Sequence, residues 1–287
     1  MNNDKVVIVA EITTNHLGDV ERLKRMVRLA KEAGADLIKI QKRNVETFYP
    51  AGKLDEPYES PFGSTWGHFR HGIELSLSDI EELDKECKKV GIDWFASVLD
   101  MPSFDHLGPF KRNLLKLPST ISEHTDLHAK VAERHRGPVV ISTGYTSPDY
   151  EQYIQDVFKE NEKIYLLQCT SAYPVPPEDC SVSVVRHYHH LSKKNPQIVP
   201  GYSSHDNGSL GCMLAVAAGA KMIEKHVKIG DTPWMHFQDV ALDLENGEFA
   251  QFVKDIRMAE RMCGDETKTI KASEWHKYTH IPKIPGQ

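Results

Sequence analysis

The sequence predicts an α/β fold, a single-domain (β/α)8 TIM barrel, on the strength of three observations. Short apolar segments alternate along the chain with segments of helical periodicity, a pattern typical of parallel strands joined by helices. The alternation gives eight strand–helix units, the number that closes into a barrel. A doubly wound sheet is the alternative, but no glycine-rich dinucleotide fingerprint follows the first strand.

The expected elements follow one another with few interruptions. Strands are expected at 5–12, 37–41, 93–99, 114–119, 138–143, 163–169, 197–204 and 221–227. The helices between and after them are expected at 19–34, about 76–90, 101–110, 126–137, 147–162, 181–195, 208–220 and 246–264. Gly34 and Gly219 each fit a helix end before a strand, within the similar segments "AKEAGADLIKI" and "AVAAGAKMIEK". We therefore expect a barrel domain over 1–270 and a C-terminal tail over 271–287.

Composition excludes several classes of protein. A net charge of −6 without a basic stripe argues against a nucleic-acid partner. The five cysteines are scattered and form no CxxC pair, so a disulfide framework or zinc knuckle is not expected. The first apolar run is too short for a signal peptide or a membrane span. We expect a soluble cytoplasmic protein with no membrane partner.

Two connections are longer than a barrel needs. Residues 43–75 follow the second expected strand and are rich in Gly, Pro and aromatic residues, and residues 228–244 follow the eighth. Both leave the carboxyl ends of their strands, where barrel enzymes carry their active sites. Long connections in a compact domain are typical of binding loops or lids, so we expect both to border a site.

Charged groups interrupt the apolar runs that should form buried strands. Lys39 lies within "LIKIQ" and Lys116 within "LLKLP". A buried ammonium group is costly unless it is paired, so each lysine needs either an internal carboxylate, such as Glu11 or Glu224, or an anionic ligand. Hydroxyl groups at the ends of strands four to six favour the anionic ligand, and the residues that carry them are Ser119, Ser142, Thr143, Thr170 and Ser171.

Two histidines end the last two strands. His226 shares one face of its strand with Glu224, and His205 ends the neighbouring strand. If these side chains point inward, the two imidazoles converge at the carboxyl mouth. Two histidines with carboxylate or water ligands suit Mn, Zn, Co or Fe(II). The alternative, which spacing alone leaves open, is a pair of satisfied core histidines.

A set of motifs in this chain resembles those of the sialic acid synthases. The matching segments are "AEITTNHLG", "IKIQ", "LLKLPS", "VVISTG", "LLQCTSAYPVPPED", "GYSSHDNG" and "GAKMIEKHVKIGD", in the family's order. The similarity covers nearly all of residues 5–265. It implies a barrel enzyme that condenses phosphoenolpyruvate with an N-acyl amino-sugar aldehyde, such as N-acetylmannosamine, to give a sialic-acid-like nonulosonic acid and phosphate.

The resemblance also implies roles for single residues. His205 and His226 would hold a divalent metal, with manganese expected and magnesium, cobalt or zinc as alternatives. Phosphoenolpyruvate would be bound by the residues matching Lys39, Lys116, Ser119, Ser142, Thr170 and Ser171. Glu11, Gln41 and Tyr173 would lie against the sugar, with Glu11 also a candidate for proton handling. The implied partners are small-molecule substrates, and a homodimer is left open.

Several positions depart from the family pattern. Thr13 stands where the opening motif has glycine, Val98 where a hydroxyl is usual, and Ile121 and Phe237 where acidic sugar contacts are usual. The antifreeze-like C-terminal domain, which supplies an arginine in family members, is not expected here. Arg43 or Arg70 could replace that cation, or the acceptor could differ.

Two other functions compete with synthesis of a sugar acid. A metal-dependent aldolase or isomerase could use the same barrel without phosphoenolpyruvate. A degenerate homologue could bind sugar acids without turnover, given the departures at the sugar side.

Overall fold

A closed barrel of parallel strands forms the body of the protein. The computed structural model describes residues 5–110, 114–277 and 280–281. The barrel strands are β1 (Val7–Thr13), β2 (Leu37–Lys42), β5 (Asp93–Val98), β6 (Leu115–Leu117), β7 (Val139–Ser142), β8 (Ile164–Gln168), β9 (Ile198–Ser204) and β10 (Met222–Lys228). Each pairs in parallel with the next, and β10 pairs with β1 to close the ring. The predicted (β/α)8 barrel is confirmed.

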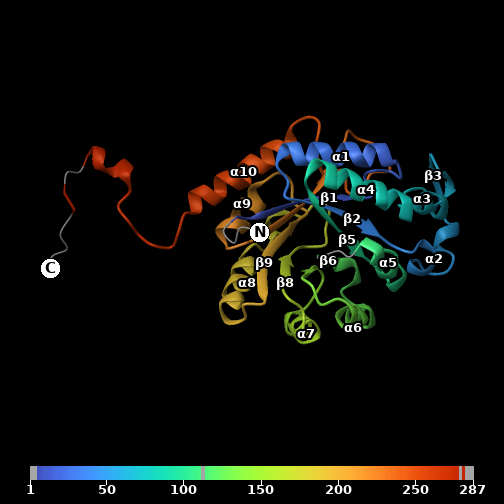
Figure 1. The fold of residues 1–287 in the computed structure, drawn as a ribbon, viewed down its shortest axis with the longest axis horizontal. Helices are drawn as coiled ribbons and strands as arrows, with labels where there is room; N and C mark the ends of the chain where they lie inside the picture. The colour runs from blue at the N-terminus through green and yellow to red at the C-terminus, as the bar shows by residue number, and fades with distance from the viewer. Residues whose placement is uncertain (1–4, 111–113, 278–279, 282–287) are drawn as a thin grey trace.

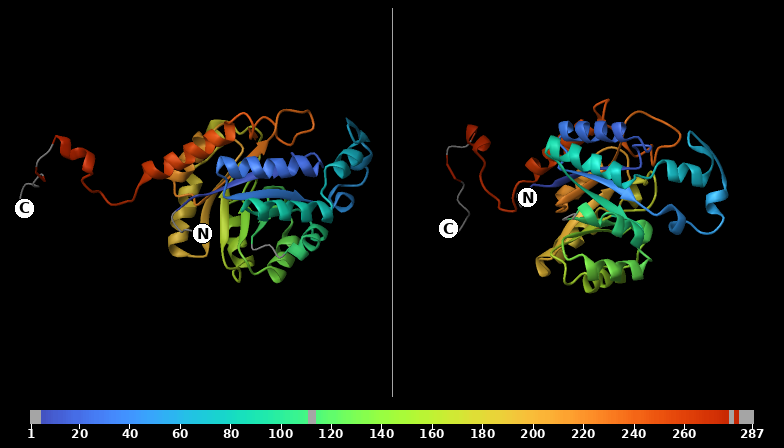
Figure 2. Two further views of the ribbon diagram at one scale, coloured as in Figure 1. Left: turned by 45° about the horizontal axis from the view of Figure 1, so that its top comes forward. Right: turned by 45° about the vertical axis from the view of Figure 1, so that its right-hand side comes forward.

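Helices surround the barrel and connect its strands (Figure 1). They are α1 (Val20–Ala33), α4 (Leu77–Val90), α5 (Met101–His106), α6 (Thr125–Arg134), α7 (Asp149–Val157), α8 (Ser183–Lys194), α9 (Leu210–Ala217) and α10 (Glu248–Cys263). Local signals fix their ends: the Asp19 side chain caps α1, and Gly34 ends it with a left-handed φ of 100°. In both views of Figure 2 the segment after α10 extends away from the barrel.

The long connection after β2 has a small structure of its own. It contains α2 (Val45–Phe48), the antiparallel pair β3 (Pro57–Ser60) and β4 (Gly63–Thr65), and α3 (Trp66–Gly72). Aromatic rings hold it together, with Trp66 centred 5.0 Å from Tyr58 and 5.4 Å from Phe69. This subdomain stands beside the barrel at the α2–α3 end in Figure 1.

Side chains inside the barrel form two different layers. The lower layer is apolar and consists of Val9, Leu37, Phe95, Val140, Leu167 and Met222. Two residues further along the strands, the inward positions are charged or carry hydroxyls, for example Glu11 on β1 and Lys39 on β2, which pair in register. The apolar layer therefore forms a floor, and the polar layer above it faces the carboxyl mouth.

Candidate active site

The predicted site residues meet in one cavity at the carboxyl mouth. This central cavity has a volume of about 200 Å³. Its lining includes Glu11, Lys39, Gln41, Lys116, Ser119, Ser142, Tyr173, His205 and His226. Thr170 and Ser171 lie beside it rather than in its lining. The Thr170 hydroxyl donates to the Asp179 carbonyl at 2.7 Å, and Ser171 donates to Ser119 Oγ at 3.0 Å.

The two buried lysines have carboxylate partners within the barrel. Lys39 Nζ contacts Glu11 and lies 2.8 Å from Glu224 Oε1, and Lys116 Nζ lies 3.2 Å from the same oxygen. Lys116 Nζ also donates to Ser142 Oγ at 2.5 Å. Both lysines are thus paired with internal carboxylates in this structure. The sequence had left two kinds of partner open, an internal carboxylate or an anionic ligand.

Burial and charge tune the protonation of this cluster. Burial lowers the pKa of Lys39 to about 7, because the neighbouring Glu224 only partly offsets the loss of solvent and Lys116 adds repulsion. Burial opposes ionisation of Glu224, but the Lys116 and Lys39 charges outweigh it and hold the pKa of that carboxyl below its usual range. Lys39 therefore exchanges protons near neutral pH while Glu224 stays ionised.

His205 and His226 face each other with ring centres 5.5 Å apart. His205 Nδ1 lies 2.8 Å from the Thr170 carbonyl, which can only accept, so Nδ1 carries the hydrogen and Nε2 keeps its lone pair. His226 Nδ1 lies 3.0 Å from Thr13 Oγ1, which donates its own proton to Glu11 at 2.6 Å. Thr13 Oγ1 therefore accepts from His226 Nδ1, and His226 also keeps the lone pair on Nε2.

Burial keeps both imidazoles neutral at pH 7. It lowers the pKa of His205 to about 4 and that of His226 well below its usual value. Neutral imidazoles with a free Nε2 are the form that binds metal. Among the described residues no group of three or more His, Cys, Asp or Glu side chains forms a metal site, so the histidine pair is the strongest candidate and leaves other coordination positions open.

An aromatic stack covers part of the mouth. The Phe237 ring lies parallel to that of Tyr173 at 3.5 Å and touches His236 at 3.7 Å between ring centres. Phe237 has a φ of 56°, which is rare for a side chain of this size. Both Phe237 and His236 line the central cavity. They come from the long connection after β10, which was expected to border the site.

Sequence reasoning missed some cavity residues that strand alternation could have revealed. Ser97 lines the cavity, whereas Val98 packs in the core between strands and helices. The departure at Val98 therefore removes nothing from the cavity, because its side chain points the other way. Ser203, at the end of β9, also lines the cavity, and its hydroxyl donates to Glu224 Oε1 at 2.9 Å. At the sugar side, Ile121 is fully buried in the core.

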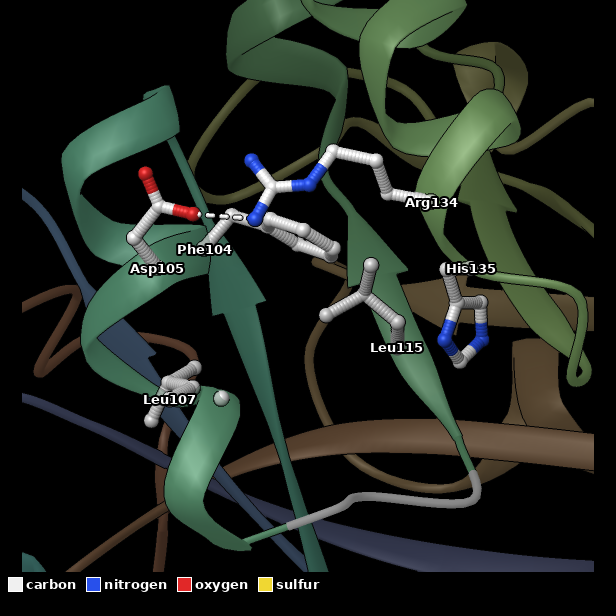
Figure 3. Close-up of a pocket in the computed structure, with 7 residues that line it drawn as sticks. Phe104, Asp105, Leu107, Leu115, Arg134 and His135 are labelled. Carbon is white, nitrogen blue, oxygen red and sulfur yellow. Dashed lines mark hydrogen bonds and ion pairs between the residues drawn. The ribbon is translucent and has the colours of Figure 1, made fainter.

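A second cavity lies far from this chemistry. It has a volume of about 230 Å³ and lies between α5, α6 and the start of β6, at the amino end of the barrel (Figure 3). Its one guanidinium among the described lining residues, Arg134, is paired with Asp105 at 2.6 Å and lies over Phe104. No cluster of reactive groups accompanies it in the described residues, so we assign the chemistry to the central cavity.

Fold and cavity together define a class of protein: a (β/α)8 barrel enzyme with carboxylate, ammonium and imidazole side chains at its carboxyl mouth. A family model described as "NeuB family" matches residues 26–268. The chain belongs to this family, and with it to the sialic acid synthases. Within the described residues no helix has the length and apolar character needed to cross a bilayer.

Named relatives are synthases of sialic acids and related sugar acids. The N-acetylneuraminate-9-phosphate synthase of Homo sapiens is 37% identical over 270 residues, which is 93% of this chain and 74% of the relative. The pseudaminic acid synthase of Campylobacter jejuni is 29% identical over 275 residues, 92% of this chain and 77% of the relative. Among solved structures, the N-acetylneuraminic acid synthetase of Leptospira borgpetersenii, in complex with citrate, has a TM-score of 0.82 at 26% identity and covers 96% of this chain and 90% of its own. The protein is accordingly a carbon–carbon bond-forming transferase that condenses phosphoenolpyruvate with a sugar.

Proposed function

We propose that the protein is a metal-dependent synthase that condenses phosphoenolpyruvate with an N-acyl amino-sugar aldehyde. The observation that carries the proposal is the meeting of the His205–His226 pair with the two buried lysines in one cavity. The named relatives differ in whether the product carries a phosphate, as the human and Campylobacter jejuni enzymes illustrate. The proposed acceptor class is therefore an amino-sugar aldehyde.

The histidine pair fits a divalent metal. The two neutral imidazoles, with ring centres 5.5 Å apart, are close enough that both would hold one ion through Nε2. Manganese is the proposed ion, since imidazole with water or substrate oxygens suits it. When bound, the ion supplies Lewis-acid activation of the aldehyde oxygen.

The lysines and serines would bind phosphoenolpyruvate. Lys116 and Ser142 already contact each other, and Ser119 lines the same part of the cavity. Ammonium and hydroxyl groups are suitable donors to carboxylate and phosphate oxygens. Ser171, which flanks the cavity, would orient Ser119 through their hydrogen bond, and Thr170 would have to release the Asp179 carbonyl to contact the substrate. Fixing both substrates in one orientation would remove several kcal/mol of the barrier, about 7–11 in the most favourable cases.

The proposed reaction forms one carbon–carbon bond and breaks one carbon–oxygen bond. C3 of phosphoenolpyruvate attacks the aldehyde carbon, water adds at C2, and the C2–O bond to phosphate breaks. The products are a 2-keto acid with three more carbons than the acceptor and inorganic phosphate. The aldehyde oxygen gains a proton and the added water loses its protons. Glu11 and Lys39, which are in contact, form the acid–base pair for these transfers.

Phosphate release provides the test. The purified protein would be incubated with phosphoenolpyruvate, Mn²⁺ and a panel of hexosamine aldehydes, and phosphate would be followed continuously. We expect release that depends on an acceptor and stops when EDTA is added. An aldolase or isomerase would instead convert the sugar without phosphoenolpyruvate. No release with any acceptor, with phosphoenolpyruvate still bound, would favour the non-catalytic alternative.

Thr13 provides a prediction about the metal. Its hydroxyl holds His226 in the metal-binding tautomer and is buried. We expect Thr13→Val to weaken Mn²⁺ binding about 10- to 100-fold, the usual effect of removing an outer partner of a ligating histidine. Calorimetric titration of Mn²⁺ measures this. Thr13→Ser keeps the hydroxyl and should bind Mn²⁺ as the wild type does; equal weakening in both variants would contradict the role of the hydroxyl.

A further inference from the structure

A surplus of buried positive charge lies at one side of the central cavity. Lys42, Arg43 and Arg70 all contact the Glu74 carboxylate, at 3.3, 3.4 and 3.3 Å. In residues 5–110, 114–277 and 280–281 no other carboxylate pairs with either guanidinium. Three cations on one carboxylate leave two positive charges uncompensated. Arg43 and Arg70 are only 7% and 3% exposed, so solvent does little to offset this charge.

Both guanidiniums are held rigidly and keep unused donors. Arg43 Nη1 donates to Tyr49 Oη at 2.7 Å, and Arg70 lies over the Tyr49 and Trp66 rings, 5.8 Å from each centre. Arg70 Nε is buried and makes no hydrogen bond to any described residue, and Arg43 Nε is buried and lies 3.4 Å from Glu74 Oε1 without forming a hydrogen bond. Buried donors of this kind are normally satisfied. A rigidly held guanidinium with free N–H donors is suited to bind an oxyanion through paired hydrogen bonds.

One of the two arginines reaches the cavity, on the side assigned to the far end of the aldehyde, while Arg70 binds the same Glu74 carboxylate outside the cavity lining. Arg43 lines the cavity, and so does His236. The His236 ring centre lies 6.2 Å from that of His226, and the positive charges of Arg70 and Arg43 act on the His236 imidazole. An imidazole carries no negative charge, so His236 does not balance the charge of the arginines.

We propose that Arg43 and Arg70 bind a phosphate monoester on the acceptor sugar, at the end remote from its aldehyde. The proposal rests on the proposed function, which places the aldehyde at His205 and His226. A phosphate monoester dianion carries the two negative charges that the cluster lacks, whereas a neutral sugar hydroxyl would leave them unmatched. The phosphate of phosphoenolpyruvate is assigned elsewhere, to Lys116 and Ser142 on β6 and β7, which β5 separates from β2 in the ring.

Paired acceptors and paired variants test this assignment. Steady-state rates would be measured with N-acetylmannosamine and with its 6-phosphate, for the wild type and for Arg43→Met and Arg70→Met. We expect the wild type to prefer the phosphorylated acceptor. Each variant should lose roughly 10- to 100-fold in kcat/KM for that acceptor, the size expected for lost hydrogen bonds to a charged group. The KM for phosphoenolpyruvate should change little, and the loss in kcat/KM for N-acetylmannosamine should be much smaller than the loss for its 6-phosphate.

Controls separate charge from folding. Arg134→Met removes a guanidinium at the opposite end of the barrel and should leave both acceptors unaffected. Arg70→Lys keeps a positive charge without the planar guanidinium, so its kcat/KM for the 6-phosphate should lie between those of the wild type and Arg70→Met. If Arg70→Met fails to fold, Arg70→Lys takes its place in the test. Equal use of both acceptors by the wild type, equal losses with both acceptors, or a matching rise in the KM for phosphoenolpyruvate would overturn the assignment.

A binding measurement keeps this test independent of turnover. Calorimetric titration of the full chain with N-acetylmannosamine 6-phosphate, without metal or phosphoenolpyruvate, should show binding that Arg43→Met weakens at least tenfold. N-acetylmannosamine should bind far more weakly. Turnover of N-acetylmannosamine without binding of the 6-phosphate would overturn the phosphate assignment and leave the proposed function standing. Binding of the 6-phosphate without turnover of any acceptor would overturn the proposed function and leave the phosphate assignment standing.

Discussion

We expect replacement of His205 or His226 by alanine to lower kcat for phosphoenolpyruvate-dependent phosphate release by about 10³-fold or more, since each change removes one of the two imidazoles proposed to hold the metal and with it the charge at the aldehyde oxygen. The two rings lie 5.5 Å apart and both present Nε2. The loss should be accompanied by loss of Mn²⁺ binding in calorimetry. Both variants should fold, because the rings lie at the cavity and not in the apolar floor.

His187→Ala is the matched control for these variants. His187 is an exposed imidazole on α8 that pairs with Glu151. Its replacement should leave both Mn²⁺ binding and turnover as in the wild type. Full turnover by either His205→Ala or His226→Ala, with Mn²⁺ still bound, would show that the pair is not the metal site.

Acid should unfold the metal-free protein steeply between pH 6.5 and 4. Burial lowers the pKa of His16, His128 and His205 to about 4, that of His236 to about 3 and that of His226 well below its usual value. Between the unfolded value of 6.5 and these folded values, the unfolded chain binds more protons, so the free energy of unfolding decreases as pH falls through this window. Each histidine contributes up to about 1.4 kcal/mol per pH unit. The five together are enough to remove the typical stability of a domain, about 5–15 kcal/mol, within two to three pH units.

Proton uptake checks this prediction directly. Calorimetric unfolding at pH 5 in buffers of different ionisation enthalpy should give an uptake of about five protons per chain. His128 packs between Tyr153 and Phe158, away from the cavity. His128→Phe should lower the uptake by one proton while leaving Mn²⁺ binding unchanged. Uptake near zero at pH 5 would mean that these histidines are already charged in the folded protein.

Most of the barrel could be predicted from the sequence because its strands are short apolar runs between strong helix-ending signals. The predicted strand at 37–41 is β2 at Leu37–Lys42, and that at 93–99 is β5 at Asp93–Val98. The bounds of less regular segments were harder to predict from the sequence. The expected helix at 147–162 covers only Asp149–Val157, because Phe158 turns the chain toward β8.

The site could be predicted where residues lie on strands, and less well where they lie on loops. Alternation on β10 places Glu224 and His226 inward, as their common face indicated. The partners of Lys39 and Lys116 could not be chosen from the sequence, because pairing depends on side-chain reach across the barrel. The Arg43–Arg70–Glu74 cluster depends on the fold of the α2–α3 subdomain, which carries no strand periodicity. Phe237 was noticed only as a departure, and its stacking on Tyr173 needed coordinates.

The most direct test of the central claim is a single turnover with phosphoenolpyruvate labelled with ¹⁸O at the bridging oxygen. The label and the organic product would both be followed by mass spectrometry, with Mn²⁺ and an amino-sugar aldehyde present. Condensation predicts that the label leaves with inorganic phosphate and that the acceptor gains three carbons as a 2-keto acid. Label retained in free pyruvate, with the sugar recovered unchanged, would contradict the assignment of this cavity to carbon–carbon bond formation.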